Sequence, residues 1–138
     1  MNREQVTGRC NCGAVTWRIE GAPLAVAACH CNNCRAQSGA AYSVNIVAKA
    51  RAVTIDGPIK GYEDTATSSG QPVTRQFCAE CGSPIRSVIA AMPAIVAIKA
   101  GTADDAGRHA PTMHVWTQSK LPWVTLPEGV PSFAQDAG

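Results

Sequence analysis

Cys10-Asn11-Cys12-Gly13 and Cys78-Ala79-Glu80-Cys81-Gly82 carry four of the seven cysteines of this 138-residue chain, and Cys29-His30-Cys31-Asn32-Asn33-Cys34 carries the other three. Every cysteine therefore lies in a CxC or CxxC pair, or in a fusion of the two. Because seven is odd, a complete set of internal disulfides is impossible. Two metal sites, one with four thiolates and one with three, would use all seven. Structural zinc is normally closed by four ligands, whereas catalytic zinc keeps an open position.

The length of the chain predicts a single domain over residues 1–138, large enough to bury a core without disulfide support. Cysteine makes up roughly 5% of the residues, below the share typical of disulfide scaffolds. The N-terminus has no apolar stretch like that of a secretory signal, and no run approaches the length of a membrane span. We therefore expect a cytoplasmic location and no membrane partner. In that compartment, such cysteine spacings favour metal or redox chemistry.

The charge of the chain gives a second constraint. The net charge is +2, and the twelve lysines and arginines form no cluster. A nucleic-acid surface usually shows a basic stripe, so nucleic acid is not an expected partner. The charge remains compatible with a small anionic ligand.

The rest of the sequence alternates apolar and polar residues over short runs separated by Gly and Pro, which is typical of a mostly β fold. One short helix is predicted over residues 32–38, ending near Gly39. Residues 131–138 are expected to form a loose tail. The predicted strands cover residues 14–20, 25–28, 41–47, 53–55, 59–63, 73–78, 84–90, 95–99 and 113–116.

The cysteines divide by position. Side chains two apart on a strand share a face, so we expect Cys10 and Cys12 to bind one ion. The Cys78–Cys81 pair predicts a tight turn, and Gly82 suits a backbone that folds beneath a metal-bound sulfur. A four-thiolate site made from both pairs would contribute about 10–16 kcal/mol. That is comparable to the whole stability of a typical domain, and this site is expected to be structural.

Cys29, Cys31 and Cys34 are close enough in sequence to form a three-sulfur site, which is the predicted functional centre. Three thiolates on zinc leave a net charge of −1 and room for a fourth ligand. An incoming thiol bound there would lose its proton and become a nucleophile. Arg35, Gln37 and Ser38 follow directly and are candidates for binding the substrate.

An alternative is that a fourth protein ligand closes this site. His30 is nearest in sequence, but strand alternation directs it away from Cys29 and Cys31. His109 and His114 could reach the site through the fold. Arg35 could offset the charge of the site or hold an anionic substrate.

Three segments together resemble the glutathione-dependent formaldehyde-activating enzyme family, and the resemblance extends over roughly residues 5 to 134. A later part, His114-Val115-Trp116 with Ser119–Trp123 and Pro131–Phe133, is also similar to the pattern of that family. The three segments are Gly8-Arg9-Cys10-Asn11-Cys12-Gly13, Cys29-His30-Cys31-Asn32-Asn33-Cys34-Arg35 with Gly39, and Phe77-Cys78-Ala79-Glu80-Cys81-Gly82-Ser83.

The resemblance implies a zinc-containing β-tent fold of antiparallel sheets. It implies a structural zinc on Cys10, Cys12, Cys78 and Cys81, and a second, labile zinc at the three-cysteine site. The implied reaction joins glutathione, as co-substrate, to formaldehyde and gives S-(hydroxymethyl)glutathione, which is carbon–sulfur lyase chemistry.

Two other functions stay open at this stage. The chain could be a zinc-stabilised binding module without turnover, or a redox sensor that uses Cys29, Cys31 and Cys34. The edges of small sheets also make a homodimer plausible.

Overall fold

A computed structural model describes residues 4–136. They form ten strands, one α-helix and four 3-10 helices, which confirms the expectation of a mostly β fold with a single short helix. The 3-10 helices are η1 (Ala50–Ala52), η2 (Ala100–Thr102), η3 (Ala106–Arg108) and η4 (Thr117–Ser119). The other elements are β1 (Gln5–Arg9), β2 (Thr16–Glu20), β3 (Ala25–Cys29), α1 (Asn32–Ser38), β4 (Ser43–Lys49), β5 (Val53–Asp56), β6 (Ile59–Asp64), β7 (Val73–Cys78), β8 (Pro84–Ile89), β9 (Ile95–Lys99) and β10 (Met113–Val115).

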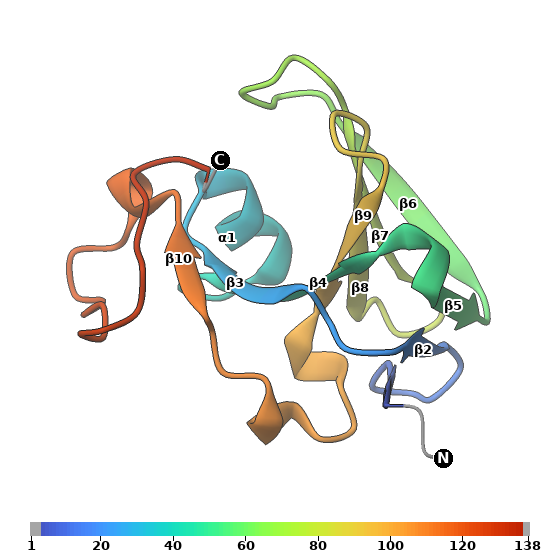
Figure 1. The fold of residues 1–138 in the computed structure, drawn as a ribbon. Coiled ribbons are helices and arrows are strands. Elements are labelled where there is room, and N and C mark those ends of the chain that lie inside the picture. The colour runs from blue at the N-terminus through green and yellow to red at the C-terminus, as the bar shows by residue number, and fades with distance from the viewer. Residues whose placement is uncertain (1–3, 137–138) are drawn as a thin grey trace.

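The strands form two sheets. The larger has seven strands in the order β10-β3-β4-β9-β8-β7-β6, and the smaller has three in the order β1-β2-β5. In Figure 1 the larger sheet runs from β10 and β3, on the left, to β6 on the right. All its neighbours are antiparallel except β10 and β3, which are parallel.

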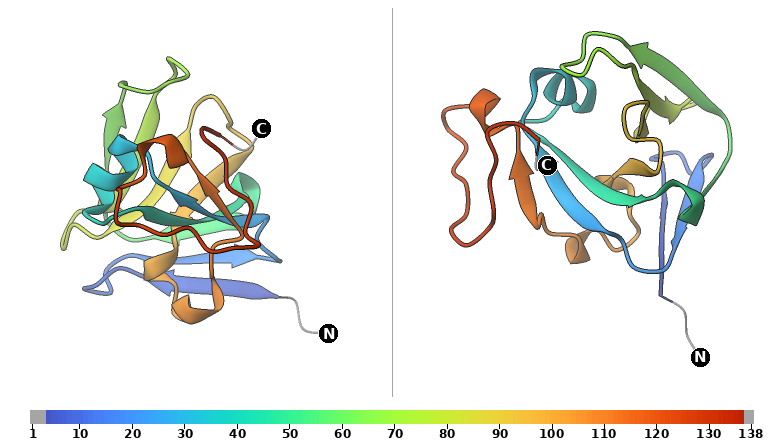
Figure 2. Two further views of the ribbon diagram at one scale, coloured as in Figure 1. Left: turned by 90° about the vertical axis from the view of Figure 1, so that its left-hand side faces the viewer. Right: turned by 45° about the horizontal axis from the view of Figure 1, so that its top comes forward.

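The two faces of the larger sheet have different chemistry. Val26, Ile46 and Ile98 lie on one face and pack in one apolar cluster with Trp17 and Ile19 of the smaller sheet. Figure 2 (left) shows β1 and β2 of the smaller sheet, in blue, below the strands of the larger one, while α1 lies higher up. The apolar core therefore fills the space between the sheets.

The opposite face, on the side of α1, is a row of buried polar residues. Strand register places Cys29 beside Ser43, Asn45 beside Lys99, and Ser87 beside Arg75. Because side chains alternate along each strand, these polar residues point away from the apolar core. Buried polar groups must find partners, so this row carries more specific interactions than an apolar face would. We call it the polar row; its members are Cys29, Ser43, Asn45, Asp64, Arg75, Ser87 and Lys99.

Helix α1 has the predicted bounds, because its ends have clear signals. Cys31 is the N-cap in extended backbone, and its Sγ accepts a hydrogen bond from the Cys34 amide at 3.2 Å. Gly39 follows in the left-handed conformation, with φ 66°, and its amide donates to the Arg35 carbonyl at 2.9 Å. Glycine reaches this conformation at little cost and ends the helix.

The expected strand through Cys10 and Cys12 is wrong. β1 ends at Arg9, and both cysteines lie in the turn that follows. The Gly13 amide donates to the Cys10 carbonyl at 3.1 Å, and Gly13 has φ 82°. The left-handed glycine allows the chain to turn back toward β2, so the turn, rather than strand alternation, orients the two sulfurs.

The expectation of a loose tail does not hold for residues 131–136. The His114 amide donates to the Pro131 carbonyl, and the Phe133 amide donates to the His114 carbonyl, both at 2.9 Å. The indole Nε1 of Trp116 donates to Asp136 at 2.9 Å. These bonds hold the segment beside β10; residues 137 and 138 lie outside the described residues.

Within residues 4–136, helices long and apolar enough to cross a membrane are absent.

Gly8 of β1 lies opposite Trp17 of β2, and a methyl group at Gly8 would overlap the Trp17 ring and the Thr102 carbonyl. Gly8→Ala is therefore expected to lower the free energy of unfolding by about 1–3 kcal/mol, measured by urea denaturation. Gly107→Ala is the control, because a Cβ there meets nothing within 4 Å. Equal stability of the two variants would show that this close contact is not tight.

Candidate metal centres

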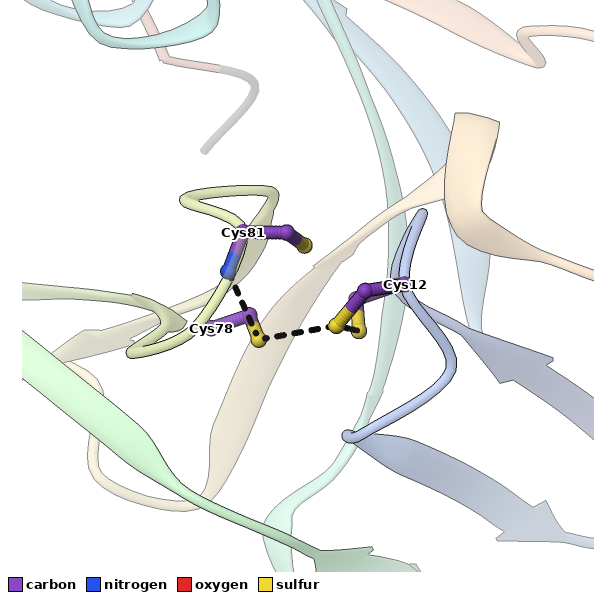
Figure 3. Close-up of side chains that lie close together, drawn as sticks. Cys12, Cys78 and Cys81 are labelled. Carbon is purple, nitrogen blue, oxygen red and sulfur yellow. Dashed lines mark hydrogen bonds between the residues drawn. The ribbon is translucent and has the colours of Figure 1, made fainter.

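The first centre joins the two sheets. The sulfur atoms of Cys10, Cys12, Cys78 and Cys81 all lie within 4.8 Å of one another. Cys10 Sγ and Cys12 Sγ are 3.6 Å apart, and Cys12 Sγ and Cys78 Sγ are 3.8 Å apart. Figure 3 shows Cys78 and Cys81 on one turn, facing Cys12 on the other. A tetrahedral zinc with Zn–S bonds of about 2.3 Å requires sulfurs about 3.8 Å apart. The donor set and its spacing fit zinc.

Backbone amides on both turns point at these sulfurs. Cys78 Sγ accepts from the amides of Glu80 and Cys81, each at 3.4 Å. Cys10 Sγ accepts from the Val15 amide at 3.3 Å. Such bonds favour the thiolate that a metal requires. The Ser83 hydroxyl acts similarly, since its contact with Cys81 lowers the pKa of that thiol to about 5.

The second centre lies where β3 runs into α1. Cys29 ends β3, Cys31 caps α1, and Cys34 is in its first turn; the three sulfurs lie within 4.8 Å of one another. Cys29 is buried, and the other two are half-buried. Contacts with Cys29 and Cys31 lower the pKa of Cys34 to about 2, and the charges of Arg75 and Lys99 act in the same direction. Contacts with Cys31 and Cys34, together with burial, raise the pKa of Cys29. Three convergent sulfurs fit zinc and favour a thiolate at Cys34.

Two of the three histidines, His30 and His114, form a separate pair. Within residues 4–136, no histidine, aspartate or glutamate joins either sulfur cluster. His30 Nε2 lies 2.9 Å from His114 Nδ1, and the His30 ring lies 4.8 Å from that of Tyr42. Burial lowers the pKa of both His30 and His114, which favours neutral rings. Histidine closure of the second centre is not seen among residues 4–136: His30 and His114 contact each other, and His109 is not part of the sulfur cluster.

An ion pair that the sequence did not reveal contacts the second centre. Arg75 Nε donates to Asp64 at 2.9 Å, and Arg75 Nη1 lies 3.8 Å from Cys34 Sγ. Asn33 of α1 donates to the same Asp64 carboxylate at 3.0 Å. Burial raises the pKa of Asp64, but the bonds from Arg75, Asn33 and Ala66 outweigh it and lower the pKa. This network fixes α1, and therefore Cys34, on strands β6 and β7.

Lys99 is the second residue that the sequence did not single out. It is 7% exposed at the end of β9, and its Nζ donates to Ser43 Oγ at 2.7 Å. Ser43 is the cross-strand partner of Cys29. In the sequence, Lys99 stands at the end of the apolar run Ile95-Val96-Ala97-Ile98. The face of the sheet to which its side chain points is set by strand pairing, which the sequence pattern does not give.

Of the predicted substrate-binding residues, Arg35 lies at a cavity. The cavity has a volume of about 350 Å³ and lies between α1 and the segment after η4. Arg35 Nη1 donates to the Ser119 carbonyl at 2.8 Å. Ser38 donates to the Arg35 carbonyl, and Gln37 Oε1 is buried without a partner among the described residues. The cavity is lined by Asn32, Arg35, Ala36, Gly39, Ala40, Ala41, Leu121 and Trp123.

Fold and sites together define a mostly β protein with two cysteine clusters that could each hold a metal ion. Residues 5–119 match the family described as glutathione-dependent formaldehyde-activating enzyme, so the chain belongs to that family. A crystal structure of a Rhodobacter sphaeroides protein shares the fold, with a TM-score of 0.54 and 15% identity. The match covers 92% of this chain and 98% of that one. No curated protein matches the chain.

The four-cysteine centre is expected to be required for folding. Cys78→Ser removes one buried ligand, and the protein should then lose its native circular dichroism and retain less than one zinc per chain. A strong chelator acting on the wild type should have the same effect.

Cys34→Ser is the matched control, because it removes a half-buried ligand of the other centre. This variant should stay folded and keep one zinc. A Cys78→Ser or fully chelated protein with a native spectrum would refute the structural role of the four-cysteine centre.

The ion pair between Arg75 and Asp64 is expected to contribute strongly to stability. Asp64→Ala leaves the Arg75 guanidinium buried without its carboxylate, with an expected cost of about 3–5 kcal/mol in chemical denaturation. Asp105→Ala breaks the exposed pair with Arg108, in which both side chains are more than two-thirds exposed. That control should change stability by less than about 1 kcal/mol. Similar losses in both variants would contradict the role assigned to burial.

Proposed function

We propose that the protein is a zinc-dependent enzyme of the carbon–sulfur lyase type, which joins glutathione or a similar thiol to a small aldehyde. Family membership supports glutathione-dependent formaldehyde activation at the level of the family. The cysteine clusters supply two donor sets that suit zinc.

The observation that carries the proposal is the three-sulfur centre. Cys29, Cys31 and Cys34 converge, and no fourth donor atom joins them among residues 4–136. Zinc held by three protein ligands leaves an open position, where a thiol binds and loses its proton readily. Cys31 and Cys34 are half-buried rather than sealed, so a small molecule has an approach to the centre.

The proposed reaction is an addition. The thiol proton leaves to water, and the sulfur lone pair forms a bond to the aldehyde carbon. The pair of electrons of the carbonyl π bond moves to oxygen, which takes a proton from water. No oxidant or reductant is needed, and the reverse sequence releases the aldehyde.

The cavity beside Arg35 is the proposed binding place for the rest of the thiol. Glutathione carries two carboxylates, and an arginine has several N–H donors, of which one is used on the Ser119 carbonyl. Asn32, Arg35 and Ala36 lie on one face of α1, next in sequence to Cys31 and Cys34. Gln37 and Ser38 remain proposed contacts at the end of the same helix.

The test combines metal content with substrate binding. Native mass spectrometry should find two zinc ions per wild-type chain and one in Cys31→Ser. Glutathione should bind the wild type and perturb the second metal only, and adduct formation with formaldehyde, followed by NMR exchange, should be faster with wild type than with Cys31→Ser.

Two results would reject this function. One zinc per wild-type chain with no effect of glutathione would favour a binding module. Equal exchange rates in wild type and Cys31→Ser, with peroxide-dependent disulfides among Cys29, Cys31 and Cys34, would favour a redox sensor.

A further inference from the structure

Lys99 is a buried cation at the second centre with no carboxylate beside it. It lies on the polar row, and its Nζ is 2.7 Å from Ser43 Oγ. Among residues 4–136, no aspartate or glutamate oxygen lies within 4.0 Å of its ammonium group. A buried charge without a counter-ion is costly, so this position requires an explanation.

Arg75 differs from Lys99 in this respect. Its guanidinium is paired with Asp64 at 2.9 Å, so the two charges cancel locally. Burial lowers the pKa of Lys99, and the charge of Arg75 acts in the same direction, whereas negative charge on Cys34, Cys29 and Cys31 opposes this shift. The strand register gives the geometric reason, because Ser43, its hydrogen-bond partner, is paired with Cys29.

The charges of the centre can be counted from these residues. Three thiolates exceed the charge of one divalent ion by one unit, and the ammonium of Lys99 cancels that excess. A fourth, substrate-derived thiolate then leaves one net negative charge. Without Lys99 the bound thiolate would leave two net negative charges, in a site where Cys29 is buried.

We propose that Lys99 is a specificity-determining residue, whose charge allows the three-cysteine centre to accept an anionic thiolate. The proposal rests on the proposed function and adds that the centre selects the thiol substrate in its deprotonated, thiolate form. Ser43 Oγ accepts a hydrogen bond from the ammonium and donates one to Asn45 Oδ1 at 3.2 Å, so a second residue of β4 fixes the serine that positions Lys99.

The experiment uses the zinc-loaded protein and its Lys99→Met and Lys99→Arg variants. Metal content is measured by native mass spectrometry, and binding of glutathione, S-methylglutathione and 2-mercaptoethanol is measured by calorimetry. Lys99→Met should keep both metals and bind the two free thiols about 10- to 100-fold more weakly. S-methylglutathione, which cannot form a thiolate, should bind within about 2-fold of wild type, and Lys99→Arg should recover part of the loss, since it keeps the charge.

Lys49→Met is the matched control, since Lys49 lies at the exposed end of β4 in the same sheet. It should bind all three ligands like wild type. Unchanged thiol binding by Lys99→Met, an equal loss of S-methylglutathione, or loss of the second metal would each overturn the proposal.

Thiol binding by the wild-type protein distinguishes a failure of this proposal from a failure of the proposed function. If it binds 2-mercaptoethanol but not glutathione, the assignment of glutathione fails, and 2-mercaptoethanol still decides the role of Lys99. If it binds neither thiol, both the function and the role of Lys99 are rejected.

Discussion

The meeting of two turns, at Cys10–Gly13 and Cys78–Gly82, is the constraint on which the structure depends. One turn joins β1 to β2 in the smaller sheet, and the other joins β7 to β8 in the larger. The Asn11 amide also donates to Ser83 Oγ at 3.0 Å, so a hydrogen bond joins the two turns in addition to the contacts between their cysteine sulfurs. The apolar core lies between the sheets that these turns connect, and it includes the buried Cys10 and Cys78.

The larger sheet separates stability from chemistry by its two faces. One face supplies Ile46, Ile98 and Val26 to the core, and the other carries the polar row beneath α1. In a sheet with one face open to solvent, water would satisfy the polar side chains, and they would not need one another as partners. Here the covering helix brings Cys34 Sγ to 3.8 Å from the Arg75 guanidinium of the sheet, and a metal or thiolate centre can form without interrupting the apolar packing.

Local signals in the sequence predicted what is local in the structure. The cysteine spacings, the glycine that ends α1 and the alternation of β2 are each contained in a few residues. β1 was missed because Gln5–Arg9 has one large apolar residue and a glycine that fits against Trp17. Lys99 and Ser43 are 56 residues apart, and only strand pairing brings them together. The turn at Cys10 depended on the conformation of Gly13, which the pattern of apolar residues does not encode.

β7 takes part in both centres, because Arg75 and Cys78 lie three residues apart on it. Because side chains alternate along a strand, residues three apart point to opposite faces of the sheet. Arg75 belongs to the polar row, and Cys78 belongs to the apolar core. The two centres therefore share one strand: Cys78 belongs to the four-cysteine cluster, and Arg75 Nη1 lies 3.8 Å from Cys34 Sγ of the other cluster. A change that shifts β7 at one centre would also act on the other.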